Sequence, residues 1–174
     1  MNLWKNTLIG GALALATFAL PAFAQGPGAK SGFTNLKVTV GAESSLVVNS
    51  TDTLLEKTDT AFGDFVTTVP TSLTYKIRTA SGAKITASLE QFNAGGPTLA
   101  NLSFVGTSSS PGTGVSDARG TISPSTELPV VTFGASANSA KSGNSASVSW
   151  NLEDDPTFQI GSYVSKVTFT ISNT

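Results

Sequence analysis

Carboxylates, hydroxyls and a few lysines are the side chains here that could do chemistry, because the 174 residues include no cysteine and no histidine. The missing imidazole and thiol exclude Ser-His-Asp and Cys-His nucleophilic catalysis. They also exclude zinc sites built on His or Cys. Three kinds of chemistry remain: calcium binding, glycoside hydrolysis by two carboxylates, and Ser-Lys catalysis.

None of these three chemistries has its defining pattern in the sequence. The acidic run Glu153-Asp154-Asp155 lacks the Asp-x-Asp-x-Asp-Gly spacing of a calcium loop, and Asp-Asp-Pro is typical of a turn. Lys84 and Lys141 lie near serines, but serines are so common that such pairs are expected by chance. The other acidic residues lie in polar or loop-like contexts that give no two of them a shared cleft; they include Glu43, Asp64, Glu90, Asp117 and Glu127. We therefore predict a non-enzymatic protein with no catalytic residue, metal site or cofactor.

Trp150 and Tyr163 are the aromatic residues considered as glycan contacts. Trp150 alternates with Val148 and Leu152, which places it on the inward face of a strand and favours burial in the core. Tyr163 precedes the last predicted strand, where a tyrosine can anchor a corner through its hydroxyl. We interpret both as structural residues first and as glycan contacts second.

An apolar series follows the glycine-rich segment of residues 25–32 and consists of Phe33, Leu36, Val38 and Val40. It has two interpretations. The one we favour makes it the first strand of the protein's own fold. In the other, it completes the sheet of a neighbouring subunit, where ladder hydrogen bonds give affinity and alternate pockets give register.

Four further segments alternate apolar and polar residues, and one of them contains Trp150. A repeat of two with one polar face is typical of half-buried antiparallel strands. Turn-forming residues at Ser81-Gly82 suggest a hairpin, and Ser108–Gly114 reads as an exposed turn. The pattern predicts an all-β, Ig-like antiparallel β-sandwich of about seven to nine strands. The four segments are Leu73–Ile77, Ile85–Leu89, Val148–Leu152 and Val167–Ile171.

The first 24 residues have the pattern of a signal peptide. Lys5 precedes the apolar run Leu8–Leu20, and Ala22 and Ala24 match the A-x-A rule for cleavage before Gln25. The run of about 13 apolar residues is too short to span a hydrocarbon core of roughly 30 Å. We expect residues 1–24 to be removed and residues 25–174 to fold as a single domain. The product would be exported to the periplasm, the cell surface or the medium, with no membrane span.

The distribution of charged residues limits the kinds of molecule that the protein is expected to bind. The net charge is −1 and the basic residues are scattered singly, whereas phosphate binding needs a clustered basic face. We therefore expect no nucleic acid partner. The partners that remain are copies of the chain itself, other surface proteins and cell-wall polysaccharide.

The ending Gly161–Ile171 resembles the Gly-x-Tyr-x-x-x-Val-x-Φ-x-Φ terminus (Φ, apolar) of two families of exported bacterial sandwich proteins. These families are disulfide-free fimbrial major subunits and spore coat protein U-like proteins. The resemblance implies an Ig-like sandwich and a structural role on the cell surface.

A second resemblance joins Trp150-Asn151-Leu152 to Phe169-Thr170-Ile171. This pair is similar to the C-terminal half of WxL domains, which attach non-covalently to bacterial cell walls. Phe169 stands where that family has Trp, so only the first motif carries over, onto Trp150 and Leu152.

The sequence thus predicts an exported structural or adhesive surface protein, and the second interpretation of Phe33–Val40 would let it assemble by strand exchange. The alternative is a module that binds cell-wall or other polysaccharide.

Overall fold

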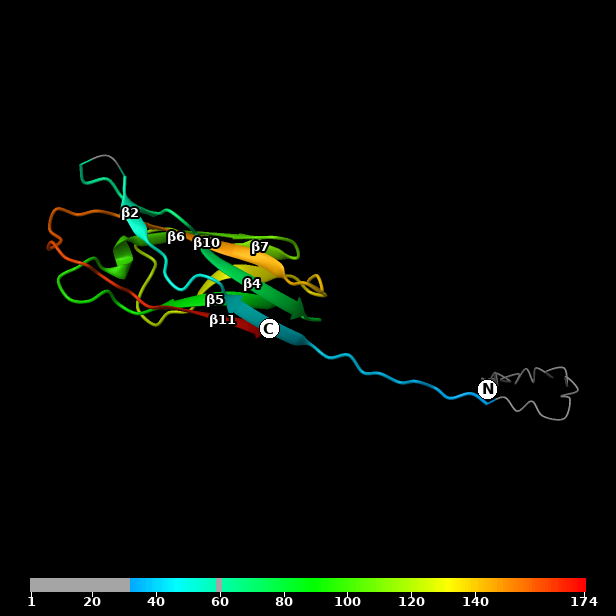
Figure 1. Ribbon diagram of the computed structural model, residues 1–174. Helices are drawn as coiled ribbons and strands as arrows, with labels where there is room; N and C mark the ends of the chain where they lie inside the picture. The colour runs from blue at the N-terminus through cyan, green and yellow to red at the C-terminus, as the bar shows by residue number, and fades with distance from the viewer. Residues whose placement is uncertain (1–31, 59–60) are drawn as a thin grey trace, which may run out of the picture. The chain divides into compact units, whose positions relative to one another are not determined.

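Two antiparallel β-sheets make up the fold in the computed structural model, which describes residues 32–58 and 61–174 (Figure 1). The chain divides into two units, Met1–Val38 and Thr39–Thr174, and all the described strands lie in the second. The expected signal peptide, residues 1–24, lies outside the described residues. The prediction of an all-β antiparallel fold is confirmed for the described part of the chain.

The first sheet has seven strands and is built around the long strand β10 (Asn144–Leu152). One edge of β10 pairs with β4 (Thr71–Arg78) and, further along, with β3 (Phe65–Thr67). Its other edge pairs with β6 (Leu102–Ser108). The outer strands are β1 (Glu43–Val48) beside β4, β2 (Leu55–Lys57) beside β3, and β8 (Ser116–Asp117) beside β6.

The second sheet has four strands in the order β11-β5-β9-β7. These are β11 (Val167–Asn173), β5 (Ala83–Leu89), β9 (Leu128–Phe133) and β7 (Gly112–Gly114). A short 3₁₀ helix, η1 (Leu99–Asn101), leads into β6. Apolar residues occupy every second position of the long strands β4, β5, β10 and β11, so each of these strands turns one apolar row toward the core that the two sheets share.

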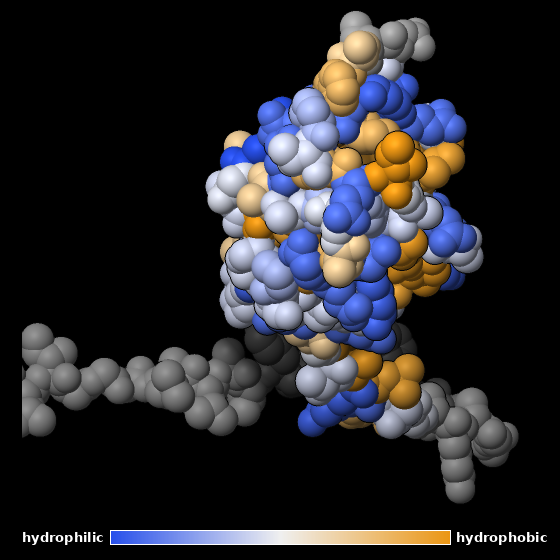
Figure 2. Space-filling model, turned by 90° about the vertical axis from the view of Figure 1, so that its left-hand side faces the viewer, coloured by the Kyte–Doolittle hydropathy of each residue, from blue (hydrophilic) through white to orange (hydrophobic). Residues whose placement is uncertain are grey.

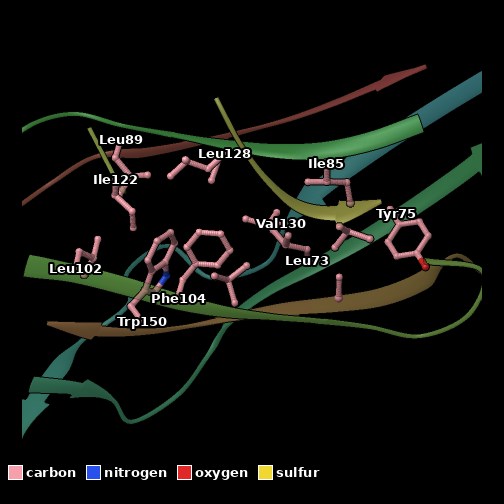
Figure 3. Close-up of a cluster of buried hydrophobic side chains, with 14 of the residues drawn as sticks. Leu73, Tyr75, Ile85, Leu89, Leu102, Phe104, Ile122, Leu128, Val130 and Trp150 are labelled. Carbon is pink, nitrogen blue, oxygen red and sulfur yellow. The ribbon is translucent and has the colours of Figure 1, made fainter. Parts of the chain in front are cut away.

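The core lies between the sheets and combines aliphatic side chains with a few aromatic rings (Figure 3). The Phe104 and Trp150 rings pack tilted with centroids 5.6 Å apart. Toward the other end, the Tyr75 and Phe133 rings meet edge to face at 5.0 Å. Such pairs stabilise a core beyond the area they bury.

The described residues form eleven strands, more than the seven to nine expected from the sequence. The difference lies in four pairing segments of two or three residues, too short to show a period: β2, β3, β7 and β8. One of them corrects the expected turn at Ser108–Gly114, since its last three residues form β7 and pair with β9.

The hairpin expected at Ser81-Gly82 is absent among the described strands, because β4 and β5 belong to different sheets. The connection between them is fastened by Thr79, whose hydroxyl donates to the Gly82 carbonyl oxygen (2.7 Å) and accepts from the Gly82 N–H (3.1 Å). Alternation identifies the buried face of each strand. It does not distinguish two strands paired in one sheet from two strands facing each other across the core.

Candidate functional site

Trp150 lies in the core and is 5% exposed. Its indole Nε1–H donates to the Thr71 hydroxyl oxygen at 3.1 Å, and its ring packs on Phe104. This placement agrees with the inward position that the alternation predicts. It leaves the indole without an open face for a sugar ring, so the structure does not place Trp150 at a glycan surface.

Tyr163 fastens two loops together. Its hydroxyl lies 2.6 Å from the Gln159 carbonyl oxygen and 3.0 Å from that of Gly95. Its ring lies directly on Gly96, where a Cβ would come within 2.2 Å of the ring. The half-buried ring and its bonded hydroxyl make Tyr163 a structural anchor of the segment that leads into β11.

The apolar series Phe33, Leu36, Val38 and Val40 lies in described residues that form no strand. Their side chains are 94%, 96%, 87% and 61% exposed, respectively. The favoured interpretation of this segment as the protein's own first strand is therefore wrong, because the first strand begins at Glu43. The ladder starts there because Glu43 pairs with Arg78, the last residue of β4, so the paired strand ends at that point.

The second sheet has an open edge at its last strand. β11 pairs with β5 along its full length, and no described strand pairs with its other edge. The inward row of β11, made of Val167, Phe169 and Ile171, packs against the core but is only partly buried. β11 therefore offers unpaired backbone groups and a half-covered apolar row at the same place.

The neighbouring edge belongs to β1 of the first sheet, which lies beside β11 (Figure 1). β1 pairs with β4 alone among the described strands, and its inward Leu46 is partly buried. Two open edges from two sheets thus lie together on one side of the sandwich. Sequence reasoning missed this feature, because alternation within a strand says nothing of its partners.

The acidic residues considered for catalysis are dispersed among separate contacts. Glu43 binds Arg78 (2.9 Å), Glu90 approaches Lys166 (3.3 Å), and Glu127 approaches Lys84 (3.9 Å). Asp64 binds Arg119, and Asp117 accepts from the Ala118 N–H (2.9 Å). Each of these five acidic residues has a different contact partner, so the structure assembles no carboxylate pair from them.

The run Glu153-Asp154-Asp155 follows β10 as irregular backbone and leads into a turn at Pro156-Thr157, which the Phe158 N–H closes by donating to the Asp155 carbonyl oxygen (3.0 Å). Asp154 binds Lys57 at 2.7 Å, and Glu153 lies 4.0 Å from Arg119. Asp155 accepts from the Thr157 N–H (2.8 Å) and hydroxyl (2.7 Å), which lowers the pKa of its carboxyl group below the usual value. Figure 2, which shows the face on the left of Figure 1, has apolar groups separated by hydrophilic ones.

The described part of the chain holds neither a cluster of metal-ligating side chains nor a membrane-spanning helix. No three His, Cys, Asp or Glu side chains come together there in a way that could hold a metal ion. No helix there is long and apolar enough to cross a membrane.

Comparison with known proteins leaves the structure itself as the guide to function. No family model, no curated protein and no solved structure matches this chain.

Proposed function

We propose that this protein is an exported, non-enzymatic subunit of a surface structure, with an Ig-like sandwich that assembles by β-strand exchange. The segment of residues 33–40, here named the donor segment, pairs with the open edge of β11 in another copy. The observation that carries this proposal is the coexistence of an exposed apolar segment and a half-covered apolar edge in one chain.

The side-chain patterns of the donor segment and β11 match. Leu36, Val38 and Val40 occupy alternate positions, with Lys37 and Thr39 between them. β11 alternates in the same way, with its apolar row separated by Thr168 and Thr170. A strand added beside β11 would extend both rows, apolar inward and polar outward. Its inward side chains would also lie near Leu46 of β1 across the core.

The energetics favour covering both features together. Each aliphatic side chain that becomes fully buried contributes about 1.5–3 kcal/mol. An exposed strand edge also presents unpaired N–H and C=O groups that pair readily with another chain. An added strand forms hydrogen bonds with these backbone groups, and the pockets for its alternate side chains fix the register of the pairing.

The test is the state of assembly of two matched variants. Leu36→Asp/Val38→Asp places two charges on the apolar row, and Asn35→Asp/Thr39→Asp places the same two charges on the polar row. Light scattering and negative-stain microscopy should show oligomers or filaments for the unaltered chain and for the second variant. The first variant should be monomeric.

A monodisperse monomer of the unaltered chain at high concentration would overturn strand exchange. Assembly that tolerates both variants equally would also overturn it. Glycan stacking on Trp150 is not part of the proposal, because that ring lies in the core.

A further inference from the structure

A hollow of about 320 Å³ lies where β1 begins and β4 ends, beside the loop of residues 138–141. This volume is at the lower end of the range of ligand pockets, about 300–1,000 Å³. Its walls carry three cations, Lys76, Arg78 and Lys141, and one carboxylate, Glu43. We name it the basic hollow. Its formal charge is +2 in a chain whose net charge is −1.

The two lysines of the basic hollow differ from the other basic residues of the sandwich. Within residues 39–58 and 61–174, every basic side chain outside the hollow has a carboxylate within 4.0 Å; these are Lys57, Lys84, Arg119 and Lys166. Arg78 also has one, Glu43, at 2.9 Å. Lys76 and Lys141 form no ion pair there, and both line the same hollow.

The fold holds Lys141 on this hollow through a tight turn. The Gly143 N–H donates to the Ala140 carbonyl oxygen (2.9 Å), which closes the turn around Lys141. Gly143 has a φ of +94°, a conformation that side chains rarely adopt. A Cβ on Gly143 would meet the Tyr75 carbonyl oxygen at 3.2 Å and Lys76 Cγ at 3.6 Å. The turn therefore lies against β4, and it places Lys141 on the same hollow as Lys76, where two cations can contact one anion.

Neutral polar groups accompany the cations. The Ile77 N–H donates to Ser139 Oγ (2.9 Å), so the hydroxyl proton of Ser139 is left to donate to a ligand. Asn138 uses its amide N–H on the Ser136 carbonyl oxygen (2.9 Å), which leaves its own carbonyl oxygen as an acceptor. Ser45 also lines the wall, opposite Lys76 in the ladder. Cations, hydroxyls and an amide acceptor together suit an anionic group that carries hydroxyls.

We propose that the basic hollow binds the carboxylate of an acidic sugar within a polysaccharide. Lys76 and Lys141 contact the carboxylate by charge-assisted hydrogen bonds. Ser139 and Asn138 contact the hydroxyls of the ring. This proposal is independent of strand exchange, because all of these residues belong to one chain.

Binding to polygalacturonate, a polymer of a uronic acid, tests the proposal, with dextran as the neutral polymer. Affinity electrophoresis should show retardation by polygalacturonate but not by dextran, and the retardation should weaken as salt screens the charges. Lys76→Gln/Lys141→Gln should weaken binding at least tenfold. The control Lys84→Gln/Lys166→Gln changes the net charge equally and should change binding less than twofold.

Three results would overturn the proposal: equal binding to dextran, no binding to polygalacturonate, or equal losses in the two double variants. Binding to inorganic phosphate or anionic lipid vesicles in place of polygalacturonate would overturn the assignment to an acidic sugar. Circular dichroism verifies that the variants fold, and shifts of the Ser139 and Ala140 amide signals on titration with galacturonate locate the site. Light scattering on the same samples measures their state of assembly, so a failure of strand exchange can be distinguished from a failure of polysaccharide binding.

Discussion

Thr71 accepts the one hydrogen bond that the Trp150 indole can donate, and both residues are buried. The hydroxyls of Thr71 and Thr53 also lie 2.7 Å apart. Tyr75 has an equivalent arrangement, since its hydroxyl donates to the Ser109 carbonyl oxygen at 2.6 Å. At the scale of single residues, each of these aromatic side chains enters the core with its polar atom bonded.

Thr71→Val should lower the free energy of unfolding by about 1–3 kcal/mol, because the buried indole N–H loses its acceptor. Urea denaturation measures this change. Thr132→Val is the matched control, since Thr132 is exposed on β9, and it should change stability by less than about 0.5 kcal/mol. Equal effects of the two substitutions would show that the Trp150 contact does not stabilise the core.

Asp155 should titrate below the ordinary Asp value of about 3.9, because the N–H and the hydroxyl of Thr157 both donate to its carboxylate. A carboxyl with a lower pKa in the folded state stabilises the fold at pH values above its unfolded pKa. That contribution is lost as the pH falls through the folded pKa. An NMR titration checks this, and Thr157→Ala should raise the pKa part of the way back. An Asp155 pKa at or above about 3.9 would contradict the turn geometry.

At the scale of strands, the sequence predicts which face of a strand is buried better than it predicts which strands pair. Alternation located β4, β5, β10 and β11, whose inward rows are apolar. It did not locate β9, where both Val130 and Val131 are buried. The ladder between β5 and β9 shifts register between Ile85 and Thr86, which leaves Val130 without a partner on β5 and breaks the period of two.

β6 was missed for a related reason, because Gly106 interrupts its apolar row. A Cβ at Gly106 would lie 2.4 Å from the Val130 carbonyl oxygen and 2.5 Å from that of Val115. The glycine therefore permits the backbone of β6 to approach the second sheet closely, which a sequence pattern does not reveal.

Gly106→Ala should destabilise the protein by about 1–3 kcal/mol or more, because the added methyl group would clash with backbone atoms of neighbouring strands. Thermal unfolding measures the loss. Gly134→Ala is the control, since a Cβ there has no neighbour within 4 Å. A melting temperature for Gly106→Ala equal to that of the control would contradict the close approach of the sheets.

The candidate surfaces were predictable only in part. The donor segment was identified from its own alternation, a local property. The open edge of β11 depends on which strands pair, and the basic hollow depends on a turn that brings Lys141 beside β4. Both are products of contacts between distant parts of the chain.

At the scale of the whole molecule, we propose that the donor segment of one copy pairs with the open β11 edge of a neighbouring copy. The chain has no cysteine, so disulfide bonds cannot be the source of its stability, and introduced cysteines report on contacts without interference. A disulfide requires Cα atoms within about 7 Å, which is satisfied by adjacent strands. The outward rows of the donor segment and β11 offer positions that leave the core intact.

Cross-linking between two differently tagged chains tests the central claim most directly. One chain carries Lys37→Cys, and the other carries Thr168→Cys or Thr170→Cys to allow for register. We predict a disulfide-linked mixed dimer on oxidation, and none when the second chain carries Ser147→Cys, in the middle strand of the first sheet. Failure of Lys37→Cys to link to either β11 position, or equal linkage to Ser147→Cys, would contradict assembly through the β11 edge.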